Sequence, residues 1–114
     1  DRYSDEFFWF RERPFVRLGP ASWRWVERAY SSTRLLRNRK KLKQMKVPIL
    51  ILATSTDELV DHPTIERAVH LIPNAELKLF GEECAHEIFR EVDEVRNDAL
   101  ASCFSFLDRV APKK

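Results

Sequence analysis

The sequence predicts an α/β protein, and the segment after residue 46 carries most of that signal. "VPILILAT" (47–54) contains five consecutive apolar residues, which is typical of a parallel-sheet strand buried on both faces. "AELKLF" (75–80) alternates apolar and charged residues, which favours a second strand nearer the edge of the sheet. A helical pattern follows each strand. Residues 47–110 are therefore predicted to run strand, helix, strand, helix, with the two strands parallel.

Amphipathic helices are expected around these strands. Apolar side chains recur at three- and four-residue steps from Trp23 to Thr33, and Leu35, Leu42 and Met45 fit either a continuation of this helix or a second short one. A proline at the first helical position and an apolar face identify the next helix, and a longer apolar face identifies the last. The helices are expected over residues 22–43, 63–72 and 92–110.

The 114 residues are expected to form a single partial domain with three parts. These are an aromatic segment (1–20), a helical segment (21–46) and the strand-helix-strand-helix part (47–114). A two-stranded sheet is marginal alone, so we expect this to be the end of a larger sheet whose earlier strands are missing. The aromatic side chains Phe7–Phe10 and Phe15 either line a pocket or fill a core, and the second interpretation is the simpler.

Charge is distributed unevenly along the chain. The net charge is +2, but residues 1–47 hold 13 Lys and Arg against 5 Asp and Glu, whereas residues 48–114 hold 7 against 13. The excess is greatest in "RNRKKLKQMK", the basic segment (37–46). This segment is either a solvated helix end or a surface for an anionic membrane or nucleic acid. The segment lacks interleaved aromatic residues, which argues against nucleic acid.

Other classes of site have little support. No apolar run reaches the ~18–20 residues of a membrane span, and Cys84 and Cys103 have no neighbours at metal-ligand spacing. We expect no metal, no cofactor and a cytoplasmic protein with reduced thiols.

Two residues stand where parallel strands place ligand sites, at the shared carboxyl edge of the sheet. Asp57 follows the first predicted strand and His86 follows the second, in "ECAHEIFRE". Asp61 is the rival acid because it shares the first loop. His62 and His70 are weaker candidates for the base, because one lies at a helix start and the other within a helix.

"VPILILATSTDELVDH" and "LIPNAELKLFGEECAHEIFREVDEVRNDALASCFSFLD" resemble the C-terminal part of α/β-hydrolases of the lysophospholipase and monoacylglycerol-lipase group, which is similar to the S33 serine aminopeptidases. The resemblance implies that Asp57, followed by "ELV", is the acid of a catalytic triad, and that His86, followed by Glu87, is its base. It implies that residues 1–20 derive from a cap. A lipid ester would be the substrate, a lysophospholipid above all. The basic first half of the chain is expected to favour contact with an anionic membrane, and the acidic second half argues against nucleic acid as a partner.

The third triad member is not in this sequence. The family nucleophile is a Ser in Gly-x-Ser-x-Gly, and the only glycines here are Gly19 and Gly81. The resemblance thus implies that the chain acts with a missing N-terminal part of the same fold and is inactive alone. The alternatives are a non-catalytic binding module derived from such a hydrolase, or a basic nucleic-acid-binding domain.

Overall fold

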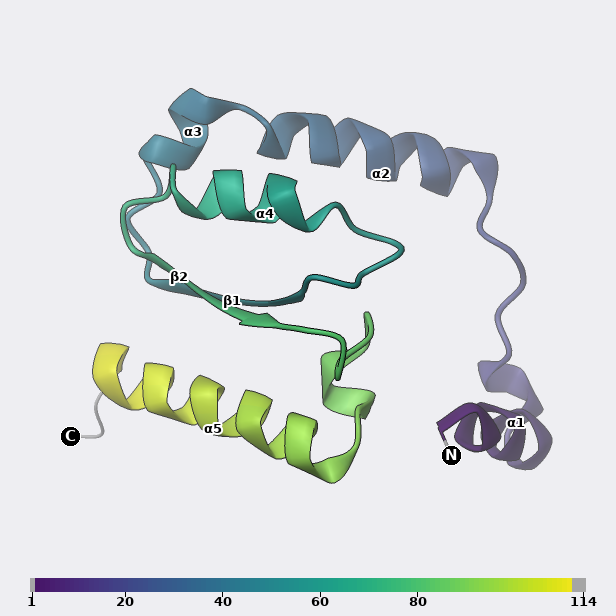
Figure 1. Cartoon of the computed structure of the whole chain (residues 1–114). Coiled ribbons are helices and arrows are strands. Elements are labelled where there is room, and N and C mark those ends of the chain that lie inside the picture. Colours follow the sequence, from purple (N-terminus) through teal and green to yellow (C-terminus); the bar gives the residue numbers. More distant parts are fainter. Residues whose placement is uncertain (1, 112–114) are drawn as a thin grey trace. The chain divides into compact units, whose positions relative to one another are not determined.

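The computed structural model describes residues 2–111, with the side chains of residues 4–111 (Figure 1). The chain divides into two compact units, Asp1–Leu35 and Leu36–Lys114. The first contains helix α1 (Arg2–Glu12), the 3₁₀ turn η1 (Pro14–Val16) and most of helix α2 (Trp23–Leu36). The second contains α3 (Arg39–Lys43), β1 (Ile49–Thr54), α4 (His62–Val69), β2 (Ala75–Phe80), η2 (Ile88–Arg90) and α5 (Asp93–Val110).

The first unit is helical and has no core of its own among the described residues. Ser22 accepts a hydrogen bond from the backbone N–H of Trp25 (3.2 Å), which caps the start of α2. No side chain of residues 4–35 is buried, and Trp23 is 88% exposed. Phe7 and Phe15 are also exposed. The interpretation that the aromatic segment fills a core is therefore wrong within this unit.

The long helix expected over residues 22–43 is interrupted. α2 ends at Leu36, and α3 begins after Asn38, whose side chain accepts hydrogen bonds from the N–H groups of Lys40 (3.1 Å) and Lys41 (3.2 Å). An Asn side chain satisfies helix-start donors well, which favours a new helix over a continuation. Leu42 therefore belongs to a second short helix, one of the two predicted possibilities.

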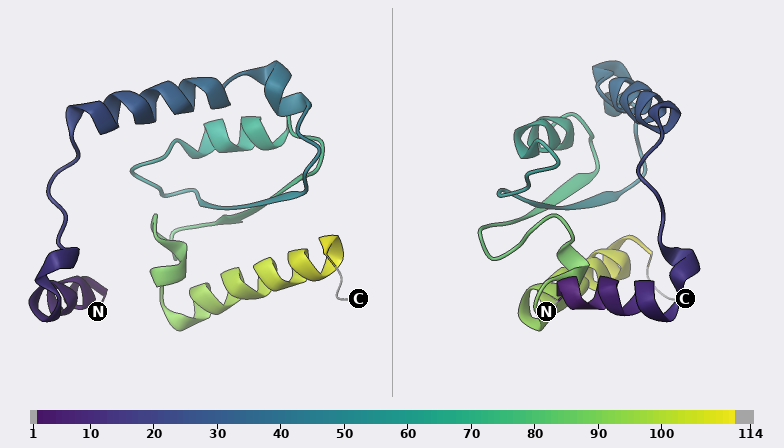
Figure 2. Two further views of the ribbon diagram at one scale, coloured as in Figure 1. Left: turned by 180° about the vertical axis from the view of Figure 1, so that it is seen from behind. Right: turned by 90° about the vertical axis from the view of Figure 1, so that its right-hand side faces the viewer.

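The second unit is a βαβ arrangement followed by a helix, as predicted. β1 and β2 are parallel, in a register that runs from Ile49 opposite Ala75 to Thr54 opposite Phe80. α4 lies on one face of this sheet and α5 on the other (Figures 1 and 2). The α/β class predicted from the sequence is confirmed.

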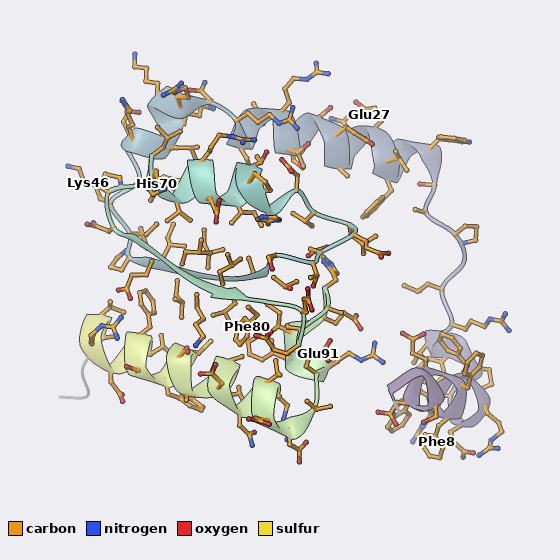
Figure 3. All side chains as sticks on the ribbon, viewed as in Figure 1. Phe8, Glu27, Lys46, His70, Phe80 and Glu91 are labelled. Atoms are coloured by element: carbon orange, nitrogen blue, oxygen red, sulfur yellow. The ribbon has the colours of Figure 1, made fainter. Side chains whose placement is uncertain are left out.

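The core of this unit lies between the sheet and α5 (Figure 3). Side chains alternate along a strand, so Phe80 shares the α5 face of β2 with Glu76 and Lys78. These two charged residues form ion pairs with α5: Lys78 Nζ lies 2.9 Å from Asp98, and Arg109 lies 2.5 Å from Glu76. The charged face of β2 is thus covered by a helix. The core cluster consists of Phe80, Cys84, Ile88, Val95 and Ala99, with Leu52 packed against it.

The expectation that β1 is buried on both faces is wrong for most of its length. Ile49 to Leu52 are only half-buried, and burial is complete only at Ala53 and Thr54. Within residues 2–111 the sheet has two strands, so one edge of β1 pairs with no strand. The side chains of β1 are therefore most buried at its carboxyl end, next to the loops that follow β1 and β2.

Candidate active site

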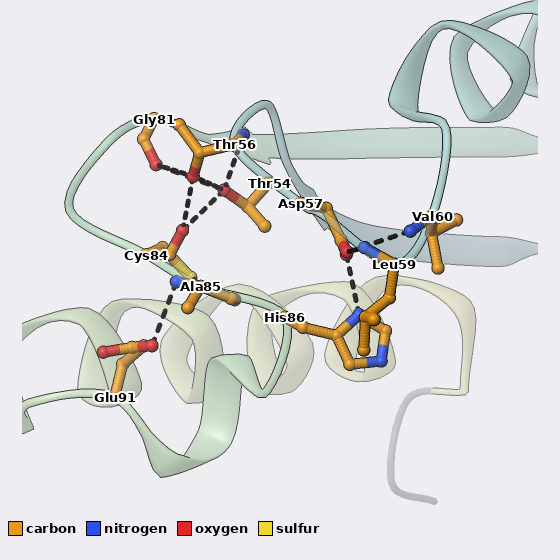
Figure 4. A network of polar contacts seen from close by, with 10 residues as sticks. All are labelled: Thr54, Thr56, Asp57, Leu59, Val60, Gly81, Cys84, Ala85, His86 and Glu91. Atoms are coloured by element: carbon orange, nitrogen blue, oxygen red, sulfur yellow. Dashed lines mark hydrogen bonds and ion pairs between the residues drawn. The ribbon is translucent and has the colours of Figure 1, made fainter.

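The loops that follow β1 and β2 bring Asp57 and His86 into contact. The Nδ1 atom of His86 lies 2.7 Å from Oδ2 of Asp57, although the two residues are 29 positions apart in the chain (Figure 4). Parallel strands share a carboxyl edge, and this contact lies there. The predicted pair of residues is thus adjacent in space.

Asp57 is held by its own loop as well as by His86. Its Oδ1 atom accepts hydrogen bonds from the backbone N–H groups of Leu59 (2.8 Å) and Val60 (3.0 Å), and its side chain is 9% exposed. Burial by itself raises the pKa of the Asp57 carboxyl. The hydrogen bonds from His86, Leu59 and Val60, together with the His86 charge, outweigh it and set the pKa below the usual 3.8. Asp57 is therefore an ionised carboxylate at neutral pH.

The contact with Asp57 fixes the tautomer of His86. An ionised carboxylate only accepts hydrogen bonds, so Nδ1 of His86 carries the proton that it donates to Asp57. In the neutral imidazole, Nε2 then keeps a lone pair and can accept a proton. The His86 side chain is 46% exposed, and Asp57 is its one polar partner among the described residues. Nε2 points away from Asp57 in Figure 4.

Two threonine hydroxyls at the end of β1 tie the two loops together. Thr54 Oγ1 lies 2.7 Å from the carbonyl oxygen of Cys84 and 3.1 Å from that of Gly81. Thr56 Oγ1 lies 2.9 Å from the Cys84 carbonyl oxygen, and the Thr54 side chain is fully buried. These contacts hold the backbone of Cys84, two residues before His86, against the end of β1, the strand that precedes Asp57. Sequence reasoning missed both threonines.

The backbone beside His86 is fixed from its other side too. The N–H of Ala85 donates to Oε1 of Glu91 (2.9 Å), and the N–H of Gly81 donates to Oε1 of Glu83 (3.0 Å). The Gly81 and Glu83 backbone hydrogen bonds lower the pKa of the Glu83 carboxyl. The loop that presents His86 is therefore anchored at Gly81, Cys84 and Ala85. Thr54 and Thr56 could have been noticed in the sequence as polar residues at the end of an apolar strand. The sequence does not show which carbonyl groups their hydroxyls reach.

The rival residues lie elsewhere. Asp61 stands at the start of α4, where its carboxylate contacts the Thr64 hydroxyl and lies 3.5 Å from Arg67. The Thr64 hydrogen bond, aided by the Arg67 charge, lowers the pKa of the Asp61 carboxyl. The imidazoles of His62 and His70 make no hydrogen bond to any described residue. Asp57, and not Asp61, is the carboxylate that contacts a histidine.

Two features are absent from residues 2–111. No three His, Cys, Asp or Glu side chains gather closely enough to hold a metal ion. None of the described helices has the length and apolar content that a membrane crossing needs.

The parallel strands and the Asp57–His86 contact at their carboxyl edge place the chain in the α/β class. The profile of one protein family, described as serine aminopeptidase, S33, matches residues 1–93. The chain belongs to this family of hydrolases, and the match spans both Asp57 and His86. Searches of curated proteins and of solved structures found no match.

Proposed function

We propose that this chain supplies the acid and the base of a serine hydrolase that cleaves carboxylic esters. The observation that carries the proposal is the 2.7 Å contact between Asp57 and His86. A buried carboxylate that holds the Nδ1–H of an imidazole is the acid–base half of a Ser-His-Asp triad. Membership of a hydrolase family supports the same conclusion.

In the proposed reaction, Nε2 of His86 takes the proton of a Ser hydroxyl as the Ser oxygen attacks the ester carbonyl. Asp57 holds the imidazole in the correct tautomer and stabilises the imidazolium. His86 then gives the proton to the leaving alcohol, and water releases the acid from the acyl-enzyme in a second cycle of the same transfers. The Ser belongs to a segment outside these 114 residues, which hold only two glycines and so no Gly-x-Ser-x-Gly.

We further propose a lysophospholipid as the substrate, with release of a fatty acid. The support is the resemblance of residues 47–110 to the lysophospholipase group. The substrate proposal and the triad proposal can fail separately. A complete protein that hydrolyses short esters but not lysophospholipids would contradict the substrate and leave the triad standing.

A fluorophosphonate probe, which labels an activated serine, tests the triad. Residues 1–114 alone should not be labelled, whereas a protein that joins this chain to a Gly-x-Ser-x-Gly segment should be labelled on that Ser. Replacing His86 by Ala in that protein should abolish labelling, and His62→Ala, a histidine with no hydrogen-bonded partner, should not. Labelling of residues 1–114 alone, or labelling that survives His86→Ala, would contradict the proposal. A parent protein without the Ser motif would favour a non-catalytic module.

A further inference from the structure

A groove of about 640 Å³ lies within the second unit, between α4 and the segment that ends in α3. Its apolar lining includes Leu36, Leu42 and Leu71, and three guanidinium groups, those of Arg37, Arg39 and Arg67, border it. None of the described residues that line it carries a carboxylate. No residue of the loops that hold Asp57 and His86 contributes to the lining, so this is a separate site.

The cations of the basic segment (37–46), which include Arg37 and Arg39 beside this groove, differ from the other described cations in the unit. Every other described Lys and Arg of the unit lies in an ion pair: Arg67, Lys78, Arg90, Arg96 and Arg109. The six cations of the basic segment (37–46) have no polar side-chain partner among the described residues. The chain contains no Asp or Glu between Glu27 and Asp57, so no acidic neighbour in sequence neutralises them.

The fold presents this unpaired charge in a fixed arrangement. The Asn38 side chain caps α3, and Leu42, only 7% exposed, anchors the helix on the unit. The six cationic residues are all exposed. An arginine fork matches the oxygens of a phosphate, so Arg37 and Arg39 are suited to bind one. Arg67 is less available, because it already lies 3.5 Å from Asp61.

The lining of the groove favours a lipid over a nucleic acid. Proteins that bind single-stranded nucleic acid stack bases on aromatic side chains, and no aromatic ring other than His70 lines the groove. Leucines do instead, and Leu36 is 64% exposed at its edge. Clusters of four to eight Lys and Arg beside apolar side chains are typical of surfaces that bind anionic phospholipids.

We propose that the groove binds the headgroup phosphate of an anionic phospholipid at a membrane surface. Arg37 and Arg39 contact the phosphate, the exposed Leu36 meets the acyl region, and the α3 lysines add attraction to the surface. This binding is peripheral and independent of the ester chemistry at Asp57 and His86. It is screened by salt, since the Debye length is only about 8 Å at physiological ionic strength.

Vesicle co-sedimentation of residues 1–114 tests the proposal. Phosphatidylcholine vesicles with phosphatidylserine should bind the chain, and pure phosphatidylcholine vesicles should not. The Arg37→Gln/Arg39→Gln variant should bind about thirtyfold more weakly, since each cation near an anionic surface gives about a fivefold gain in affinity. The matched control is Arg24→Gln/Arg34→Gln, which removes the same charge from two arginines of α2 that have no polar partner among the described residues, and it should lower affinity less than threefold.

Four outcomes would overturn the proposal. The first is no preference for the anionic vesicles. The second is an equal loss in the two double variants, which would reduce the effect to net charge. The third is tighter binding to single-stranded RNA than to the vesicles at equal salt. Inorganic phosphate should not displace the chain from vesicles at millimolar concentration, and displacement by it would contradict a lipid ligand.

Circular dichroism should show that both variants are folded, because neither pair of arginines has a partner among the described residues to lose.

Discussion

At the carboxyl edge of the sheet, the Asp57 carboxylate, Nδ1 of His86 and the backbone at Gly81, Cys84 and Ala85 all have hydrogen-bond partners within the chain. In the basic segment (37–46), six cations have no partner among the described residues. The first arrangement restricts movement and sets a tautomer, which is what acid–base chemistry needs. The second leaves charge available to a ligand from outside. The contrast indicates that a preorganised site differs from a docking surface in whether its charged side chains are paired within the chain, more than in how many it has.

The largest effect should come from breaking the pair itself. In a protein that joins this chain to the Ser nucleophile, Asp57→Asn should lower kcat by about 10⁴-fold, because an amide no longer selects the tautomer with the free Nε2. Steady-state hydrolysis of a short ester measures this. Asp61→Asn, in the rival acid at the start of α4, should change kcat by less than tenfold. Equal losses in the two variants would remove the distinction between them.

A smaller effect should come from the threonine contacts beneath the pair. Thr54→Val removes a buried hydroxyl that reaches the carbonyls of Gly81 and Cys84, and should lower the free energy of unfolding by about 1–3 kcal/mol. It should also move the pKa of Asp57, measured by carbon NMR, toward its usual value, because the loop of His86 is less constrained. Thr33→Val, at an exposed hydroxyl of α2, is the control. Lost stability with an unchanged Asp57 pKa would assign Thr54 a packing role only.

The pH dependence of stability should carry the signature of Asp57. Its pKa in the folded chain lies below the usual 3.8, so its contribution to stability is present above that value. The contribution is lost as the pH falls through the lowered pKa. The difference in unfolding free energy between the chain and Asp57→Asn should therefore shrink on acidification below about pH 4. Chemical denaturation at several pH values measures it, and a difference independent of pH would contradict the account.

The smallest effect should come from the basic segment. The side chains of Lys40 and Lys41 are exposed and have no partner in the part of the chain that the structure describes, so Lys40→Gln/Lys41→Gln should change the free energy of unfolding by less than about 0.5 kcal/mol. Urea denaturation checks this. A decrease in the free energy of unfolding of more than about 1 kcal/mol would mean that these lysines have partners within the fold. The contrast between the two regions would then be wrong.

The local sequence pattern predicted the positions of the helices and strands better than it predicted how deeply their side chains are buried. "AELKLF" gave the bounds of β2, whereas β1 begins two residues later than expected, at Ile49, because Pro48 has no N–H to donate to the ladder. The break before α3 follows from the capping preference of Asn38, a signal that was present in the sequence.

The site was predictable only in its two main residues. Asp57 and His86 follow predicted parallel strands, so topology alone brings them to one edge. The contacts of Thr54 with carbonyls 27 and 30 positions away depend on the path of a loop, which no local pattern determines. The burial of β1 depends on how many strands lie beside it, and the periodicity of a sequence does not determine that number.

The central claim is that His86 is the base of an ester hydrolase. Its most direct test is kcat for ester hydrolysis by a protein that joins this chain to the Ser-bearing segment, with His86→Ala measured beside His62→Ala. If His86 is the base, kcat should fall at least about 10⁴-fold in His86→Ala and less than tenfold in His62→Ala. Full activity in the His86→Ala protein would contradict it.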